Sequence, residues 1–337
     1  MYLRIIFLFL LPTLFSTSCS NDFELTELGT ELPVVYGLLS QADTAVYIRI
    51  EKTFLSEDVE PKILAQDPAN FYYNDILVEL TNTSDDAKYL LQRVNGNLEG
   101  YPRSEGGFVT DPNYIYKIHT NKLNGGKLGD NVLYELQIKK EDGTVLAKAN
   151  TRTLRAMSEK DITVPSTAGS LSFDYSRDFT VGFRSDQNAH IHDIYLKVYY
   201  SEVKNGVSEE KVLRWPIVKN YNANQPNNLN ITYSIKGRSF YEFLKANIEE
   251  DPFTSRFLKS GAIEISSGGV EIKDYINIVQ ANLGITSSGE VPSYTNIENG
   301  IGLFSSRSYL TRENISFTVM TRDSVANGTI TKKLNFK

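Results

Sequence analysis

Residues 132–149 read VLYELQIKKEDGTVLAKA, and this stretch decides the fold class. Large apolar side chains recur there at every second position, which is the period of a half-buried strand with one face in water: Val132, Tyr134, Leu136 and Ile138. The turn residues Glu141-Asp142-Gly143 follow, so Thr144–Ala149 is expected to be the returning strand of a hairpin.

The same period of two occurs upstream, in Val46-Ile48-Ile50, Ile76-Val78-Leu80 and Tyr114-Tyr116-Ile118. Short strands at this spacing predict an immunoglobulin-like or fibronectin-like β-sandwich over residues 32–157. Between two of these strands, residues 54–73 contain Pro61 and Pro68, and we expect a long loop or strand excursion there. The aromatic residues at its end, Phe71, Tyr72 and Tyr73, are candidate binding contacts, with core packing as the alternative.

Residues 158–167 are polar, contain Pro165 and show no sustained period, so they are the expected joint to a second β-rich domain over 158–337. The dipeptide Asn205-Gly206 favours a hairpin between strands 190–200 and 207–218. Two further strands, 301–309 and 315–321, are expected to close this domain.

Two helices are expected within the second domain, near residues 239–250 and 270–282. Ser239 and Glu242 have the spacing of a capping box, with Ser239 as the N-cap residue. Apolar residues then follow the period of a helix with one buried face: Phe240, Phe243, Leu244 and Ile248 in the first helix, and Ile272, Tyr275, Ile276 and Val279 in the second.

The amino terminus predicts export and a lipid anchor. Ile5–Phe15 is apolar and has the length of a signal-peptide core, too short to cross a bilayer as a helix. Small residues and then Cys19, the only cysteine of the chain, follow it and resemble a bacterial lipobox, although Ser16 stands where that motif usually has Leu. We therefore expect residues 1–18 to be a lipoprotein signal peptide and residues 19–31 an acylated tether.

The anchor indicates the outer membrane. Asp22 and Glu24 stand just after Cys19. Acidic residues in this position resemble the signal that directs Bacteroidota lipoproteins to the outer leaflet. We expect exposure on the cell surface, with a periplasm-facing anchor as the alternative. The net charge of −6 and the absence of any Lys/Arg block argue against a nucleic acid as partner, because binding nucleic acid depends on clustered cations.

His190 and His192 are weak candidates for a metal site, since alternate residues of a strand point to the same side. That side also carries Ile194 and Leu196, so a hydrogen-bonded position at the rim of an apolar face is the simpler interpretation. No G-x-S-x-G turn, phosphate-binding loop or dinucleotide-binding loop occurs in the chain. We expect no cofactor and no enzymatic activity.

Three stretches, residues 33–39 (PVVYGLL), 47–55 (YIRIEKTFL) and 292–304 (PSYTNIENGIGLF), resemble the Bacteroidota lipoprotein family known as domain of unknown function 4249. The resemblance implies an anchored β-rich protein, expected beside a TonB-dependent outer-membrane transporter, and assigns no catalytic residue. In the late motif, Asn299-Gly300 predicts a turn and Gly302 a close approach of a neighbouring element. We expect this motif to be a fold-closing hairpin, with a partner-docking edge as the alternative.

Three functions remain open at this stage. The leading hypothesis is a lipid-anchored accessory protein of the outer membrane that binds a nutrient or a protein partner beside a transporter, through loops at the ends of its sandwiches. The first alternative is an adhesin-like structural module of the cell surface. The second is a metal-dependent hydrolase that uses His190 and His192.

Overall fold

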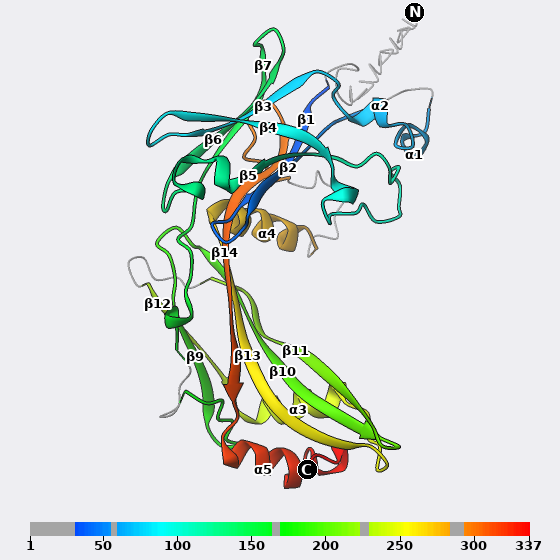
Figure 1. The fold of residues 1–337 in the computed structure, drawn as a ribbon, viewed down its shortest axis with the longest axis vertical. Helices are drawn as coiled ribbons and strands as arrows, with labels where there is room; N and C mark the ends of the chain where they lie inside the picture. The colour runs from blue at the N-terminus through cyan, green and yellow to red at the C-terminus, as the bar shows by residue number, and fades with distance from the viewer. Residues whose placement is uncertain (1–30, 55–58, 164–168, 223–228, 284–292) are drawn as a thin grey trace, which may run out of the picture. The chain divides into compact units, whose positions relative to one another are not determined.

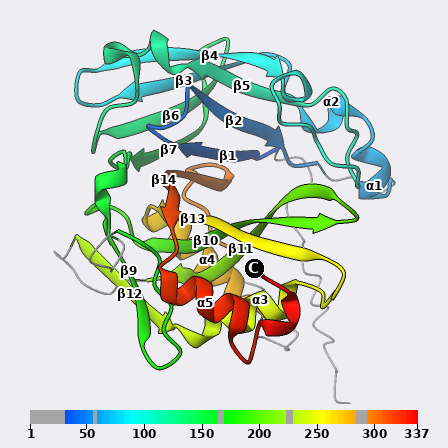
Figure 2. The ribbon, with the colours of Figure 1, turned by 60° about the horizontal axis from the view of Figure 1, so that its bottom comes forward.

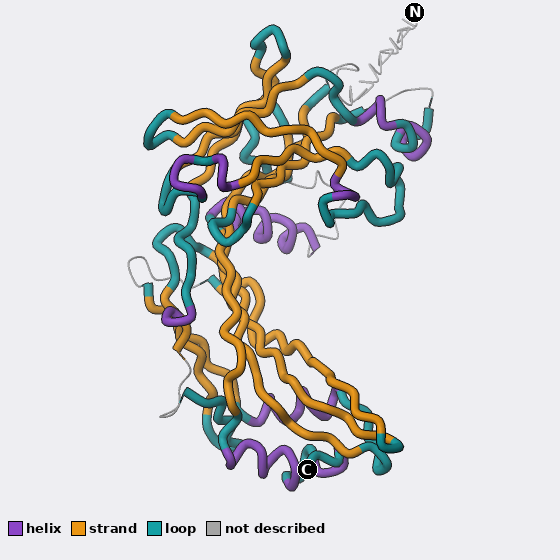
Figure 3. The backbone as a smooth tube through the Cα atoms, viewed as in Figure 1, coloured by secondary structure: helices purple, strands orange, loops and turns teal. Residues whose placement is uncertain are grey.

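A computed structural model describes residues 31–54, 59–163, 169–222, 229–283 and 293–337. Cys19, Asp22 and Glu24 lie outside the described residues. Residues 31–337 form one compact unit in which strands predominate (Figure 3). The predicted class, mostly β with an N-terminal sandwich and helices in the second part, is confirmed.

The strands are β1 Pro33–Leu39, β2 Ala45–Lys52, β3 Ile76–Asn82, β4 Ala87–Asn95, β5 Tyr114–His119, β6 Leu133–Lys140, β7 Val145–Arg152, β8 Ile162–Thr163, β9 Asp178–Arg184, β10 Ile191–Lys204, β11 Val207–Tyr221, β12 Asn230–Lys236, β13 Ser255–Gly268 and β14 Ile301–Ser316 (Figure 1). The helices are α1 Pro61–Leu64, α2 Pro68–Phe71, α3 Arg238–Asn247, α4 Val270–Leu283 and α5 Val319–Asn327. The long loop expected over 54–73 contains α1 and α2. No helix in the described ranges is long and apolar enough to cross a membrane.

The N-terminal strands form a sandwich whose two sheets share β4. The first half of β4 pairs with β3 and the second half with β5, so the strand passes from one sheet to the other. The hydrogen-bonded ladder is continuous through β4, with β14-β1-β2-β5 in one layer and β3-β6-β7 in the other. Side chains that alternate along both sheets meet in one core, as their period of two predicts; they include Val35, Ile48, Ile50, Val78, Leu80, Tyr134, Leu136 and Ile138.

The second core lies between the β10–β11 hairpin with β13 and β14 on one side, and α3, α5 and the small β8-β9-β12 sheet on the other. Figure 2 shows α3 and α5 side by side below these strands. The predicted hairpin is confirmed: Asn205 and Gly206 both have positive φ, as its two-residue turn requires.

Both predicted helices of the second part are confirmed, as α3 and α4. The predicted cap of α3 is wrong, because its N-cap residue is Gly237 and Ser239 lies inside the first turn. Glycine is required at this cap, since a Cβ at Gly237 would lie 2.2 Å from the Asp174 carbonyl oxygen. The apolar face of α3 faces the core as expected, with Phe240 and Leu244 fully buried.

The predicted strand over 315–321 is wrong. A single strand, β14, continues to Ser316, and α5 begins three residues later. The Thr318 side chain accepts a hydrogen bond from the Thr321 backbone N–H, and this cap favours the helix over a further strand. The segment after β14 therefore closes the second core as a helix.

β14 takes part in both cores. Its residues 301–306 pair in parallel with β1, and residues 307–316 pair antiparallel with β13. The expected hairpin at the late motif is therefore wrong, because β14 pairs there with β1, which is far away in the sequence. Ile297 and Phe304, both beyond residue 158, pack into the first core. The other buried residues of the first core lie before residue 150, and the buried residues of the second core lie after residue 161.

Candidate functional site

An open groove of about 320 Å³ lies on the outer face of the first sheet, where β14, β1 and β2 run side by side. Its volume is at the lower end of the range of about 300–1,000 Å³ found for ligand sites. The described residues that line it are mainly aromatic, apolar or basic: Tyr36, Gly37, Leu38, Asp43, Ala45, Tyr47, Arg49, Tyr101, Ile115, Leu303 and Arg307.

The alternation of the strands places these side chains outside the core. In β1, Val35 and Leu39 face the core, so Tyr36 and Leu38 face outward and are exposed. Tyr36 lies between Leu303 of β14 and Arg49 of β2 in the ladder. An apolar residue, an aromatic ring and a guanidinium therefore stand next to one another on one face of the sheet.

Tyrosines line the side of the groove toward β2. The rings of Tyr47 and Tyr101 lie 4.7 Å apart and are tilted by 55°. The Tyr47 hydroxyl donates to Glu99 at 3.0 Å, in the same loop as Tyr101. Half of the Tyr101 side chain is exposed, so its ring is available for a ligand.

On the β14 side, Ser305 donates a hydrogen bond of 2.6 Å to Glu271 of α4, which places that helix beside the strand. Burial raises the pKa of Tyr36, and the nearby Tyr275 of α4 and Glu51 act in the same direction. Tyr36 is therefore a neutral phenol at physiological pH, able to donate and to accept a hydrogen bond.

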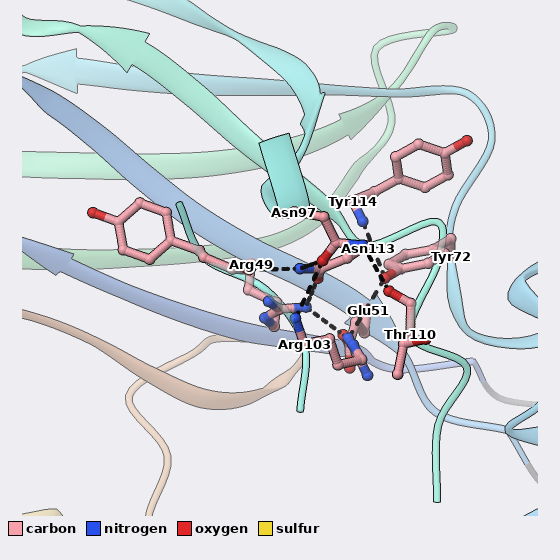
Figure 4. Close-up of polar contacts among 9 residues, drawn as sticks. Arg49, Glu51, Tyr72, Asn97, Arg103, Thr110, Asn113 and Tyr114 are labelled. Carbon is pink, nitrogen blue, oxygen red and sulfur yellow. Dashed lines mark hydrogen bonds and ion pairs between the residues drawn. The ribbon is translucent and has the colours of Figure 1, made fainter. Parts of the chain in front are cut away.

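A network of polar side chains holds Arg49 in place (Figure 4). Arg49 Nη1 donates to Asn113 Oδ1 at 2.8 Å and to Glu51 Oε1 at 3.2 Å. Asn113 is fully buried, and its amide donates to Asn97 Oδ1 at 3.0 Å and to the Tyr101 carbonyl at 2.7 Å. The groove therefore contains a guanidinium whose position is set by buried partners, with 28% of its side chain still exposed.

The opposite end of the groove carries a compensated charge pair. Arg307 Nη2 lies 3.2 Å from Asp43 Oδ2, and the Tyr309 hydroxyl donates to Asp43 Oδ1 at 3.1 Å. The carboxylate of Asp43 is therefore neutralised by its own neighbours. Asp43 and Arg307 are 264 residues apart in the sequence, so only the pairing of β14 with β1 brings them together.

The two histidines of the weak metal candidate lie in different environments. His190 is exposed and precedes β10, whereas His192 is 2% exposed, and its Nδ1 lies 2.9 Å from Ser267 Oγ. The expected hydrogen-bonded position beside an apolar face is confirmed for His192, whose ring also contacts Phe183. Within the described residues, no group of three or more His, Cys, Asp or Glu could hold a metal ion.

Burial lowers the pKa of His192 to about 4, and the charge of His190 acts in the same direction. Below pH 6.5 the unfolded chain binds a proton at this residue that the folded protein does not accept until about pH 4. The stabilisation that His192 contributes in its neutral form is therefore complete above pH 6.5 and is lost as the pH falls. We expect the loss of this stabilisation to lower the free energy of unfolding by about 3 kcal/mol between pH 7 and pH 4.

The measurement is urea unfolding at pH 7, 6, 5 and 4 for the wild type and for His192→Asn. Asparagine does not titrate, and its amide nitrogen can replace Nδ1 as the partner of Ser267. The variant should therefore lose less stability than the wild type over this range. Parallel curves for the two proteins would show that His192 does not carry the effect.

The three aromatic contact candidates are not an exposed surface. Phe71 and Tyr72 are buried, and Tyr73 is half-buried, so core packing is the correct interpretation. Phe71 packs against Phe108 at 5.4 Å between ring centroids, while the Tyr72 hydroxyl accepts the Tyr114 backbone N–H at 3.1 Å. These residues stabilise the side of the sandwich next to the Arg49 network.

The groove was not predicted from the sequence. Two of the three stretches quoted for the family resemblance contain Tyr36, Tyr47 and Arg49, and the period of two places these residues opposite the core. That signal was sufficient to find an outward face. Tyr101 comes from an irregular loop, and nothing in its local sequence indicates that it reaches the groove.

No family model matches the chain, and no curated protein does. Among solved structures, the chain is similar to the selenomethionine-substituted chicken interferon gamma receptor alpha chain. The two chains are 7% identical, the match covers 71% of this chain and 88% of that chain, and the TM-score is 0.17. A likeness at this score carries no argument about function. The resemblance to domain of unknown function 4249 stays a prediction.

Proposed function

We propose that this protein is a lipid-anchored binding protein of the outer membrane, which holds a small nutrient in the β14-β1-β2 groove beside a TonB-dependent transporter. The observation that carries the binding role is the groove itself, a concave site lined by three tyrosines and a fixed arginine. Cys19 and the family resemblance support the anchor and the transporter.

The chemistry of the groove supports binding more than catalysis. The described residues that line it include no His, Cys or Ser that could act as a nucleophile or a general base. Tyrosine and arginine, together with tryptophan, are enriched among the residues that carry most of the binding energy of protein interfaces. Asp43 is the one carboxylate of the lining, and it is already bonded to Arg307 and Tyr309.

The experiment is purification of the full acylated protein in mild detergent, followed by identification of the proteins and small molecules that accompany it. We expect a β-barrel transporter at near-equal amount and a bound small molecule. Polymer binding without a stoichiometric membrane partner would contradict this function and favour the adhesin-like module. The same sample would show the diacylglyceryl mass at Cys19.

Tyr101→Ala should lower ligand retention by about 30-fold, the effect of removing an aromatic residue worth about 2 kcal/mol of binding. Its backbone carbonyl still accepts the Asn113 amide, so the loop keeps its anchor. Leu98→Ala is the matched control, because Leu98 is 86% exposed in the same loop and lies outside the groove lining. Equal retention by the two variants would show that the ligand does not bind in this groove.

A further inference from the structure

We propose that the groove recognises an organic acid in which a carboxylate stands next to an aromatic or apolar body, with Arg49 as the anion-binding residue. This inference rests on the proposed binding function and names its ligand class. Charge, preorganisation and the arrangement of the tyrosines each support it.

The charged side chains among the described residues that line the groove do not balance. Two guanidiniums, those of Arg49 and Arg307, face one carboxylate, that of Asp43, in a protein whose formal net charge is −6. Asp43 pairs with Arg307, while Arg49 shares Glu51 with Arg103. Glu51 and Arg103 are mostly buried, so solvent screens the charges around Arg49 less than it would on an open surface. An anionic ligand compensates the unmatched charge.

Arg49 is held in the manner that carboxylate recognition requires. Both hydrogen bonds that it makes with described residues use Nη1, to Asn113 and Glu51. A guanidinium binds a carboxylate through two parallel N–H donors, and fixing it in advance removes part of the entropy cost. Asn113, with no exposed surface, is the fixed point of this arrangement.

The rest of the ligand follows from what surrounds Arg49. Tyr36 is its direct neighbour across β1 and β2, and Leu303 adjoins Tyr36 on the other side. The paired rings of Tyr47 and Tyr101 line the same groove. Aromatic faces prefer offset or tilted contact with another ring and also bury apolar groups. The volume of about 320 Å³ suits one such body rather than a long polymer.

The test is calorimetric titration of the full acylated protein in mild detergent with N-acetylphenylalanine, its uncharged amide and 3-phenylpropionate. We expect the acids to bind at least about tenfold more tightly than the amide, because charge-assisted hydrogen bonds are lost with the carboxylate. If N-acetylphenylalanine binds more tightly than 3-phenylpropionate, the carboxylate of the ligand comes from the carboxyl-terminal residue of a peptide. If the two acids bind equally, the ligand is a free aromatic acid.

Arg49→Gln should abolish the preference for acid over amide. Arg177→Gln is the matched control that keeps it, because 84% of the Arg177 side chain is exposed and the residue lies outside the groove lining. Should Arg49→Gln fail to fold, the salt dependence of the wild type decides: affinity for the acids must fall between about 0.01 M and about 0.15 M salt, while affinity for the amide stays constant. An amide that binds as tightly as the acid, or no binding of either acid, would overturn the inference. A native ligand whose retention still depends on Tyr101 would leave the proposed function standing in that case.

Discussion

Replacing Gly302 with alanine is expected to lower the free energy of unfolding by about 4 kcal/mol, among the largest effects of a single substitution. Gly302 has a φ of +122° in β14, and a Cβ there would lie 2.0 Å from the Val35 carbonyl oxygen and 2.9 Å from its carbon. Both are backbone atoms of β1, so no side-chain rotation relieves the clash. The parallel pairing of β1 with β14 must open, and the floor of the groove with it.

Gly143→Ala is the control for the effect of φ alone. Gly143 has a φ of +87° in the β6–β7 turn, and a Cβ there meets nothing within 4 Å. This substitution should lower the free energy of unfolding by about 1–2 kcal/mol, which is the cost of a left-handed conformation for a residue with a side chain. Urea unfolding of both variants, together with ligand retention, gives the comparison. Similar losses in the two proteins would contradict a close approach of β1 at Gly302.

Phe240→Ala should lower the free energy of unfolding by about 4 kcal/mol, because it leaves a large cavity in a packed core. The ring of Phe240 is fully buried and stacks on Phe173 at 4.1 Å with an interplanar angle of 12°. It also contacts Phe317 and Trp215, at 5.7 and 6.1 Å between centroids. The substitution therefore removes the aromatic partner of Phe173, Trp215 and Phe317 at once.

Phe253→Ala provides the matched control, since Phe253 is 82% exposed and the same change there should cost less than about 0.5 kcal/mol. Urea unfolding measures the difference. Trp215 is the only tryptophan, so its emission spectrum reports locally on the cavity. An unchanged spectrum with unchanged stability in Phe240→Ala would contradict the packing of the second core.

Local patterns predicted most elements, because the period of apolar residues records which face of a segment is buried. Residues 132–149 form the expected hairpin, and the face of α3 that contains Phe240 and Leu244 is buried as expected. Gly302 was also predicted correctly as a point of close approach, since only glycine accommodates it. The errors lie where a distant partner decides. Residues 319–321 begin a helix, and β14 pairs with β1 rather than in a hairpin.

The sequence by itself determined the mostly-β class, the hairpin at Asn205-Gly206 and the two amphipathic helices, since each depends on residues close together in the chain. Only the tertiary structure decided which outward faces meet to form a site. Tyr36, Arg49 and Leu303 are adjacent because β14 returns to lie against the first strand. The position of the Arg49 side chain likewise depends on buried Asn113, which lies 64 residues further along the chain. The periodicity of the sequence does not predict such contacts, because they depend on pairing between segments that are far apart in the chain.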